Sequence, residues 1–329
     1  MKKQKRYLND RGKKNMENVE ACLLKANGIF DEVKKVVFGK DEIISKVLMA
    51  ILAKGHILID DIPGVGKTTM AMAFSEAMGL KENRIQFTPD VLPADVTGFS
   101  MYNRETNKFE YKAGAVMCNL LLGDEINRTS PKTQSALLQV MEEGSVTVDG
   151  ITRIVPKPFI VIATQNPTGS VGTQKLPESQ LDRFMIKITI GYPELSDEVA
   201  IMKGKQLDPF RTLRKAITES ELIQIQEVVR NIFVDDSIYE YIAKIAESTR
   251  VNPDLQLGMS PRGSIFLISM AKAKAFLCGR NYVLTSDVHN VIFDTIEHRI
   301  LLNSHAKLNN ITEKIVIKNI LQTIPVPKV

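Results

Sequence analysis

Apolar and polar positions follow two different patterns along the chain, and the change falls near Tyr192. Before it, short apolar runs of the kind found in buried strands alternate with stretches in which apolar residues recur at helical spacing. The runs are HILID, RIQF, NLLLGDE, PFIVIATQ and MIKITI. Strands that alternate with helices predict an α/β domain, in which a parallel sheet lies between two layers of helices.

Two segments interrupt this alternation. In the first, FSMY and KFEY flank the polar sequence NRETN; in the second, SVTV and ITRIV are joined by Asp149 and Gly150, a strong signal for a two-residue hairpin. Both lie between elements of the predicted sheet, so we expect two β-hairpins that project from it. The alternative is that both are loops without a role.

After Tyr192 the strand pattern disappears, and apolar positions keep helical spacing to the end of the chain. This pattern predicts a small all-helical second domain at 204–329. The preceding α/β domain would cover 15–203 and carry both hairpins.

Composition and charge add little beyond the first residues. With 44% apolar and 25% charged residues among 329, the chain resembles an ordinary globular protein. Residues 1–14 hold seven Lys or Arg against Asp10, and so account for the net charge of +5; we expect a disordered basic tail there.

No run reaches the roughly 18 to 20 apolar residues of a membrane span, and no signal peptide is evident, which favours a cytoplasmic protein. Cys22, Cys118 and Cys278 lie far apart, as expected of reduced, buried thiols.

The segment HILIDDIPGVGKTT has the order strand, glycine-rich loop, helix that binds phosphates. Backbone N–H groups near Gly64 and Gly66 would point at the β-phosphate, Lys67 would reach the β and γ oxygens, and the Thr68 hydroxyl would bind Mg²⁺. The pattern GxxxxGK[ST] has Asp61 where its first glycine is expected. We therefore predict a nucleoside triphosphate site whose loop comprises Pro63, Gly64, Val65, Gly66, Lys67, Thr68 and Thr69.

Polar residues at the ends of later strands suggest the remaining chemistry. Asp124 and Glu125 end the run LLLGDE; Asp124 would hold Mg²⁺ through its water shell, and Glu125 would polarise the attacking water. Asn166 ends the next strand, and its amide could orient that water or contact the γ-phosphate. The alternatives are that the two carboxylates are solvated charges, that Asn166 forms a turn before proline, and that Arg183 and Arg262 make surface ion pairs.

In this order, these motifs resemble the AAA+ ATPases and, within their helix 2 insert clade, the MoxR family. The resemblance covers about 36–288 and is carried by GHILIDDIPGVGKTT, FTPDVLPADVTG, LLLGDEINRTSPKTQSALLQVMEEG, VIATQNP, LPESQLDRF and SPRGS. It implies a P-loop NTPase domain with a three-layer parallel sheet, followed by a helical lid, with the segment 193–217 as hinge. It also implies specific roles: Walker A at Asp61–Thr68, Walker B at Leu120–Glu125, sensor 1 at Asn166, the arginine finger at Arg183, sensor 2 at Arg262, and an adenine pocket at Val37, Phe38 and Gly39.

The resemblance further implies an ATP- and Mg²⁺-dependent, hexameric, chaperone-like remodeller that matures or activates a partner, with a von Willebrand factor A domain protein as the expected client. Two alternatives remain. One is a nucleotide-gated assembly module with negligible turnover alone. The other is a DNA-dependent motor, which the mixed charges of the two hairpins disfavour because phosphate tracking requires a basic surface.

Overall fold

The computed structural model describes residues 2–62, 64–166, 175–204 and 212–327. They form two compact units: an α/β unit of Asp31–Val47 and Lys54–Glu219, and a lid unit of Met1–Phe30, Leu48–Ala53 and Ser220–Val329. The division therefore falls after Glu219 and not at the predicted 203. The reason is local, because the N–H groups of Ala216 and Ile217 both donate to the carbonyl of Ala77, at 2.8 and 3.3 Å.

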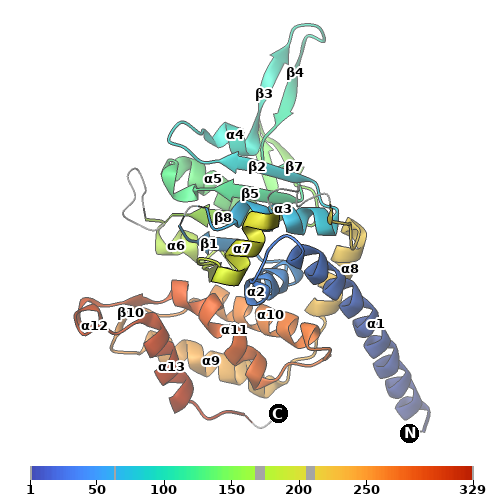
Figure 1. Cartoon of the computed structure of the whole chain (residues 1–329), viewed down its shortest axis with the longest axis vertical. Coiled ribbons are helices and arrows are strands. Elements are labelled where there is room, and N and C mark those ends of the chain that lie inside the picture. Colours follow the sequence, from blue (N-terminus) through green and yellow to red (C-terminus); the bar gives the residue numbers. More distant parts are fainter. Residues whose placement is uncertain (1, 63, 167–174, 205–211, 328–329) are drawn as a thin grey trace. The chain divides into compact units, whose positions relative to one another are not determined.

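The α/β unit is built on a five-stranded sheet in the order β2-β5-β8-β1-β9, and every neighbouring pair is parallel. This confirms the predicted fold class, and each of the five apolar runs supplies one strand (Figure 1). The strands are β1 (Ile57–Asp60), β2 (Glu82–Gln86), β5 (Leu120–Asp124), β8 (Ile160–Gln165) and β9 (Ile186–Ile188).

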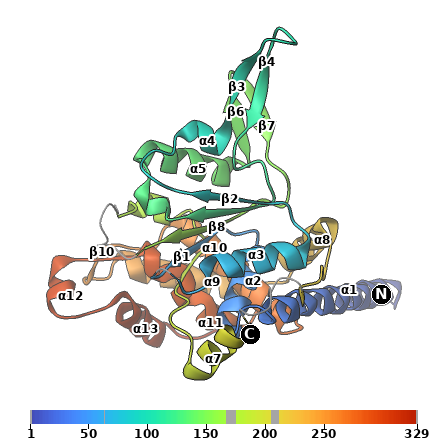
Figure 2. The same ribbon diagram turned by 45° about the horizontal axis from the view of Figure 1, so that its top comes forward.

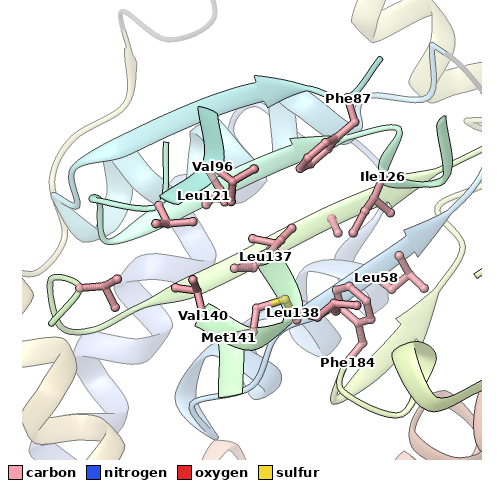
Figure 3. Packing of buried hydrophobic residues seen from close by; sticks show 14 of the residues in the cluster. Leu58, Phe87, Val96, Leu121, Ile126, Leu137, Leu138, Val140, Met141 and Phe184 are labelled. Carbon is pink, nitrogen blue, oxygen red and sulfur yellow. The ribbon is translucent and has the colours of Figure 1, made fainter. Parts of the chain in front are cut away.

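Helices cover both faces of this sheet. Figure 2 shows α3 (Lys67–Met78) on one side and α4 (Pro93–Thr97) with α5 (Pro131–Glu143) on the other. On the α5 side, alternate residues of the strands pack against that helix in a fully buried cluster (Figure 3), as expected for a sheet enclosed on both faces. Its members include Leu58, Phe87, Leu121, Leu137, Leu138, Val161 and Phe184.

Both predicted hairpins are present and project from the sheet (Figures 1 and 2). The first pairs β3 (Gly98–Asn103) with β4 (Lys108–Ala113), and the second pairs β6 (Ser145–Val148) with β7 (Ile151–Ile154). In the second, Asp149 and Gly150 have φ values of 51° and 73°, the two left-handed residues that a type I′ turn requires.

The rest of the α/β unit contains short elements that the sequence analysis did not anticipate. They include α6 (Glu178–Leu181), the 3₁₀ turn η1 (Ile126–Arg128) and α7 (Leu195–Gly204). Another helix, α2 (Asp41–Leu52), contributes residues to both units. The segment 193–217, expected as a linker, is thus helical over its first half.

The lid unit is mainly helical, as predicted, with one correction. Leu255 and Leu257 of a short strand pair with Leu302 and Leu301 of another, so the unit is not all-helical. The pairing satisfies backbone hydrogen bonds between segments that connect helices. Its elements are α8 (Glu219–Arg230), α9 (Asp236–Arg250), β10 (Leu255–Leu257), α10 (Pro261–Leu277), α11 (Thr285–Ile296), η3 (Glu297–Arg299), β11 (Leu301–Leu302), α12 (Ser304–Leu308) and α13 (Glu313–Thr323).

The first helix, α1 (Lys2–Lys34), begins earlier than expected. We expected residues 1–14 to be a disordered tail, but the helix includes them from Lys2 on. Lys and Arg are good helix formers and the segment has no proline, which is compatible with its continuation. None of the described helices has the length and apolar character needed to cross a membrane.

The three cysteines are free thiols, but only two are buried. Cys22 and Cys118 are enclosed as expected, whereas Cys278 is exposed. The reason is its position: Cys278 is the residue that ends α10, at the surface end of that helix.

Candidate functional site

A cavity of about 320 Å³ lies where β1, β5 and β8 end and α3 begins. Two glycines of the loop between β1 and α3 line it, Gly64 with φ of 87° and Gly66 with φ of 90°. A Cβ atom on either glycine would meet no atom within 4 Å, so glycine is required here for the left-handed backbone and not for space. Pro63, which we assigned to the loop, lies outside the described residues.

Lys67 begins α3 and its side chain is buried in the cavity. Its Nζ donates to the carbonyl of Asp61 at 2.5 Å and to Oδ1 of Asn166 at 3.4 Å. Burial lowers the pKa of this ammonium, although Asp61 and Asp124 oppose the shift by their charges. The lysine is therefore a cation enclosed beside the loop, which suits it to contact phosphate oxygens.

Asp61 replaces the expected first glycine because its carboxylate has a structural task. The group is buried; its Oδ1 accepts from the N–H of Ile62, and its Oδ2 accepts from the N–H groups of Ile190 and Gly191 at 2.7 and 2.6 Å. The side chain thus ties the start of the loop to the chain that leaves β9. No glycine could do this.

Gly123, directly before Asp124, is required by the packing of β5. A Cβ atom there would stand 3.0 Å from Cε2 of Phe87, whose ring is buried in the cluster of Figure 3. A larger residue before Asp124 would displace that ring.

Asp124 is buried at the end of β5, between the strands β2 and β8. Its Oδ2 accepts from Nε of Arg84 at 2.7 Å, and its Oδ1 accepts from the hydroxyl of Thr164 at 3.3 Å. The Thr164 hydroxyl also accepts from the N–H of Glu125 at 3.0 Å. The two neighbouring strands therefore fix the orientation of this carboxylate.

Glu125 turns the chain out of the sheet with φ of 58°, a left-handed conformation that is unusual for a residue other than glycine. Its Oε1 accepts from Nδ2 of Asn166 at 2.9 Å, and its Oε2 accepts from a terminal nitrogen of Arg128 at 2.8 Å. Burial alone would raise the pKa of Glu125, but the bonds from Arg128 and Asn166 outweigh it and lower the pKa. The carboxylate is held as an anion.

Most of the predicted residues thus meet in one cavity, together with three that the sequence analysis missed: Arg84, Gln86 and Thr164. Arg84 and Gln86 come from β2, and no motif marked them. Their place follows only from the position of β2 next to β5. The expected lining residues are Gly64, Gly66, Lys67, Thr68, Thr69, Asp124, Glu125 and Asn166.

Other predicted residues do not line this cavity. Arg183 follows α6 and pairs with Glu142, at 3.1 Å between Nε and Oε2. Val65 belongs to the loop, and Arg262 lies in the first turn of α10 in the lid unit. The roles of these residues, and of the adenine pocket at Val37, Phe38 and Gly39, stay predictions.

The donor set fits Mg²⁺ and a triphosphate. One hydroxyl, from Thr68, and one carboxylate, from Asp124, are the oxygen ligands that Mg²⁺ uses when waters and phosphates complete its shell. Within the described part of the chain, His, Cys, Asp and Glu form no group of three or more that could hold a metal by themselves. The left-handed glycines and the enclosed lysine provide the matching phosphate cradle.

Comparison with known proteins agrees with this geometry. The ATPase family associated with various cellular activities (AAA) matches residues 56–186, and the AAA lid domain matches residues 247–320.

The uncharacterized protein YeaC of Bacillus subtilis is 48% identical over 298 residues, 90% of this chain and 93% of that protein. Chaperone MoxR1 of Mycobacterium tuberculosis is 38% identical over 307 residues, 91% of this chain and 81% of the relative. A crystal structure of a candidate ATPase from Cytophaga hutchinsonii has a TM-score of 0.90 and 35% identity, covering 97% of this chain and 99% of that chain. The chain therefore belongs to the MoxR family of AAA ATPases.

Proposed function

We propose that the protein hydrolyses ATP with Mg²⁺ and uses the turnover to remodel a partner protein. One observation carries the first half of this proposal. Asn166 bonds to Lys67 through its Oδ1 and to Glu125 through its Nδ2, at 3.4 and 2.9 Å. The cation that would bind the phosphates and the carboxylate that would polarise water are thus joined by one amide.

Each residue of the cavity has a distinct task in this proposal. The N–H groups of the loop and Lys67 bind the phosphate oxygens, and Thr68 and Asp124 hold the metal, which when bound neutralises charge on the phosphates. Glu125 orients and polarises the attacking water, and Asn166 keeps that carboxylate facing the cavity.

Assembly and client belong to the same proposal. Arg183 lies outside its own cavity and is partly exposed, which suits a residue that serves the site of a neighbouring subunit in a hexameric ring. An arginine supplied in this way accelerates related NTPases by about 10³ to 10⁵. The description of the relative MoxR1 as a chaperone supports a remodelling role, and we infer a von Willebrand factor A domain protein as client.

The test is steady-state ATP turnover of Glu125→Gln, with binding of a fluorescent ATP analogue measured in parallel. We expect binding close to that of the parent and turnover reduced by about 10² or more, because the amide cannot polarise water as the carboxylate does. Glu143→Gln, at an exposed position of α5, is the matched control. Unchanged turnover in Glu125→Gln would refute the catalytic assignment.

The alternative, a nucleotide-gated module with negligible turnover alone, has one observation in its favour. Both oxygens of Glu125 already accept hydrogen bonds within the chain. Mixing two inactive proteins, Arg183→Ala and Glu125→Gln, separates the cases. Recovery of activity in the mixture indicates a site shared between subunits, and its absence favours the module.

A further inference from the structure

Arg128 has a place at the site that no motif of the sequence analysis assigned. It ends η1, the short turn that directly follows Glu125. The left-handed backbone at Glu125 reverses the chain, and the N–H of Arg128 donates to the carbonyl of Glu125 at 2.9 Å. This turn brings the guanidinium back to the Glu125 side chain.

The two oxygens of Glu125 are divided between two partners. Asn166, from β8, donates to Oε1, and Arg128, from the turn after β5, donates to Oε2 at 2.8 Å. A carboxylate held at both oxygens from two different elements has little freedom to rotate. Each oxygen keeps a second lone pair, so the carboxylate can still accept a proton from water.

The Arg128–Glu125 pair is partly enclosed. The side chain of Glu125 is 22% exposed and that of Arg128 39%, while Nε of Arg128 is buried without a hydrogen-bond partner among the described residues. Leaving that nitrogen unpaired has a cost, which the charged bond from the terminal nitrogen to Glu125 helps to offset.

We propose that Arg128 is a positioning residue for ATP hydrolysis, which with Asn166 fixes both oxygens of Glu125 and thereby sets the face that this carboxylate presents to the attacking water. The inference rests on the proposed function. Arg128 is not expected to touch the nucleotide, since it is absent from the lining of the cavity.

The experiment compares Arg128→Met with Arg128→Lys, which keeps the charge, by measuring kcat and KM for ATP at pH 8. Arg230→Met is the matched control, because Arg230 also pairs with a glutamate three residues away, at 3.7 Å from Glu227 in the lid unit, and is 73% exposed. For Arg128→Met we expect kcat to fall about tenfold with KM within about twofold, because a carboxylate that is no longer held at both oxygens presents the wrong face to the water for part of the time.

Arg128→Lys should recover most of the parent's kcat, and Arg230→Met should match the parent in both constants. The inference is overturned if Arg128→Met keeps the parent's kcat, if its KM rises while kcat stays the same, or if Arg128→Lys loses as much kcat as Arg128→Met. Should Arg128→Met not fold, as judged by circular dichroism, Arg128→Gln carries the same expectation. Glu125→Gln, assayed beside them, separates the two proposals: normal turnover there rejects the ATPase mechanism, whereas an inactive Glu125→Gln with an unaffected Arg128→Met rejects only the role of Arg128.

Discussion

The stability of the α/β unit should depend on pH through one histidine. His56 immediately precedes β1, and both nitrogens of its ring are bonded within the protein. Nδ1 accepts from the N–H of Val161 at 3.0 Å, so the proton lies on Nε2, which stands 3.1 Å from the carbonyl of Met141. Burial lowers the pKa of His56 from 6.5 to about 4, although the bond to Met141 acts in the opposite direction.

The sign and size of the effect follow from these values. The folded protein keeps His56 neutral down to about pH 4, whereas the unfolded chain takes up a proton below about pH 6.5, so stability is lost as the pH falls from 6.5 towards 4. Between pH 6.5 and pH 5 the loss amounts to at most about 2 kcal/mol, at about 1.4 kcal/mol per pH unit. Because the side chain of His56 is partly exposed, we expect the free energy of unfolding to fall by about 1 to 2 kcal/mol over this pH range.

The measurement is urea unfolding, followed by circular dichroism at pH 7.5, 6.5 and 5, of the parent and of His56→Gln. The variant loses an acceptor for Val161 and should be less stable at every pH, but its stability should fall less between pH 7.5 and pH 5. Taking the difference between the two proteins removes the contribution of the lid unit. His305→Gln, which removes an exposed histidine of α12, is the control. Equal pH dependence in the parent and His56→Gln would refute the reasoning.

Two further predictions concern the phosphate loop. Gly66→Ala places a side chain at a left-handed backbone position, which costs about 1 to 2 kcal/mol of strain, and it should weaken ATP binding. The affinity is measured by titration with a fluorescent ATP analogue. The control is Gly150→Ala, which is also left-handed but lies in the hairpin turn, and it should leave the affinity for ATP unchanged. Asp61→Ala leaves the N–H groups of Ile190 and Gly191 without their acceptor and should reduce the free energy of unfolding by about 2 to 4 kcal/mol. An unchanged urea midpoint would contradict the structural role of Asp61.

The sequence contained enough information for the fold and for the centre of the site. Strands buried on both faces are continuous apolar runs, and GKT after a strand and before a helix marks the phosphate loop even though Asp61 replaces its first glycine. The meeting of Glu125 with Asn166 was also predictable, because both end strands of one parallel sheet, and carboxyl ends of such strands share an edge.

The remaining contacts depend on information that local patterns do not contain. Arg84 reaches Asp124 only because β2 lies next to β5, and the order of strands in a sheet is decided by packing. Arg128 reaches Glu125 only because the backbone there is left-handed, which no spacing rule assigns to a glutamate. The pairing of Arg183 with Glu142 on α5 likewise depends on tertiary neighbours.

The carboxylate of Asp61 spans a separation of 129 residues, from the start of the nucleotide loop to the amide of Ile190. The polypeptide beyond that amide continues into α7 and on towards the lid unit. While these bonds persist, the start of the nucleotide loop and the segment that leaves β9 must move together. A side chain that departs from the family motif thereby couples the loop to the outgoing chain.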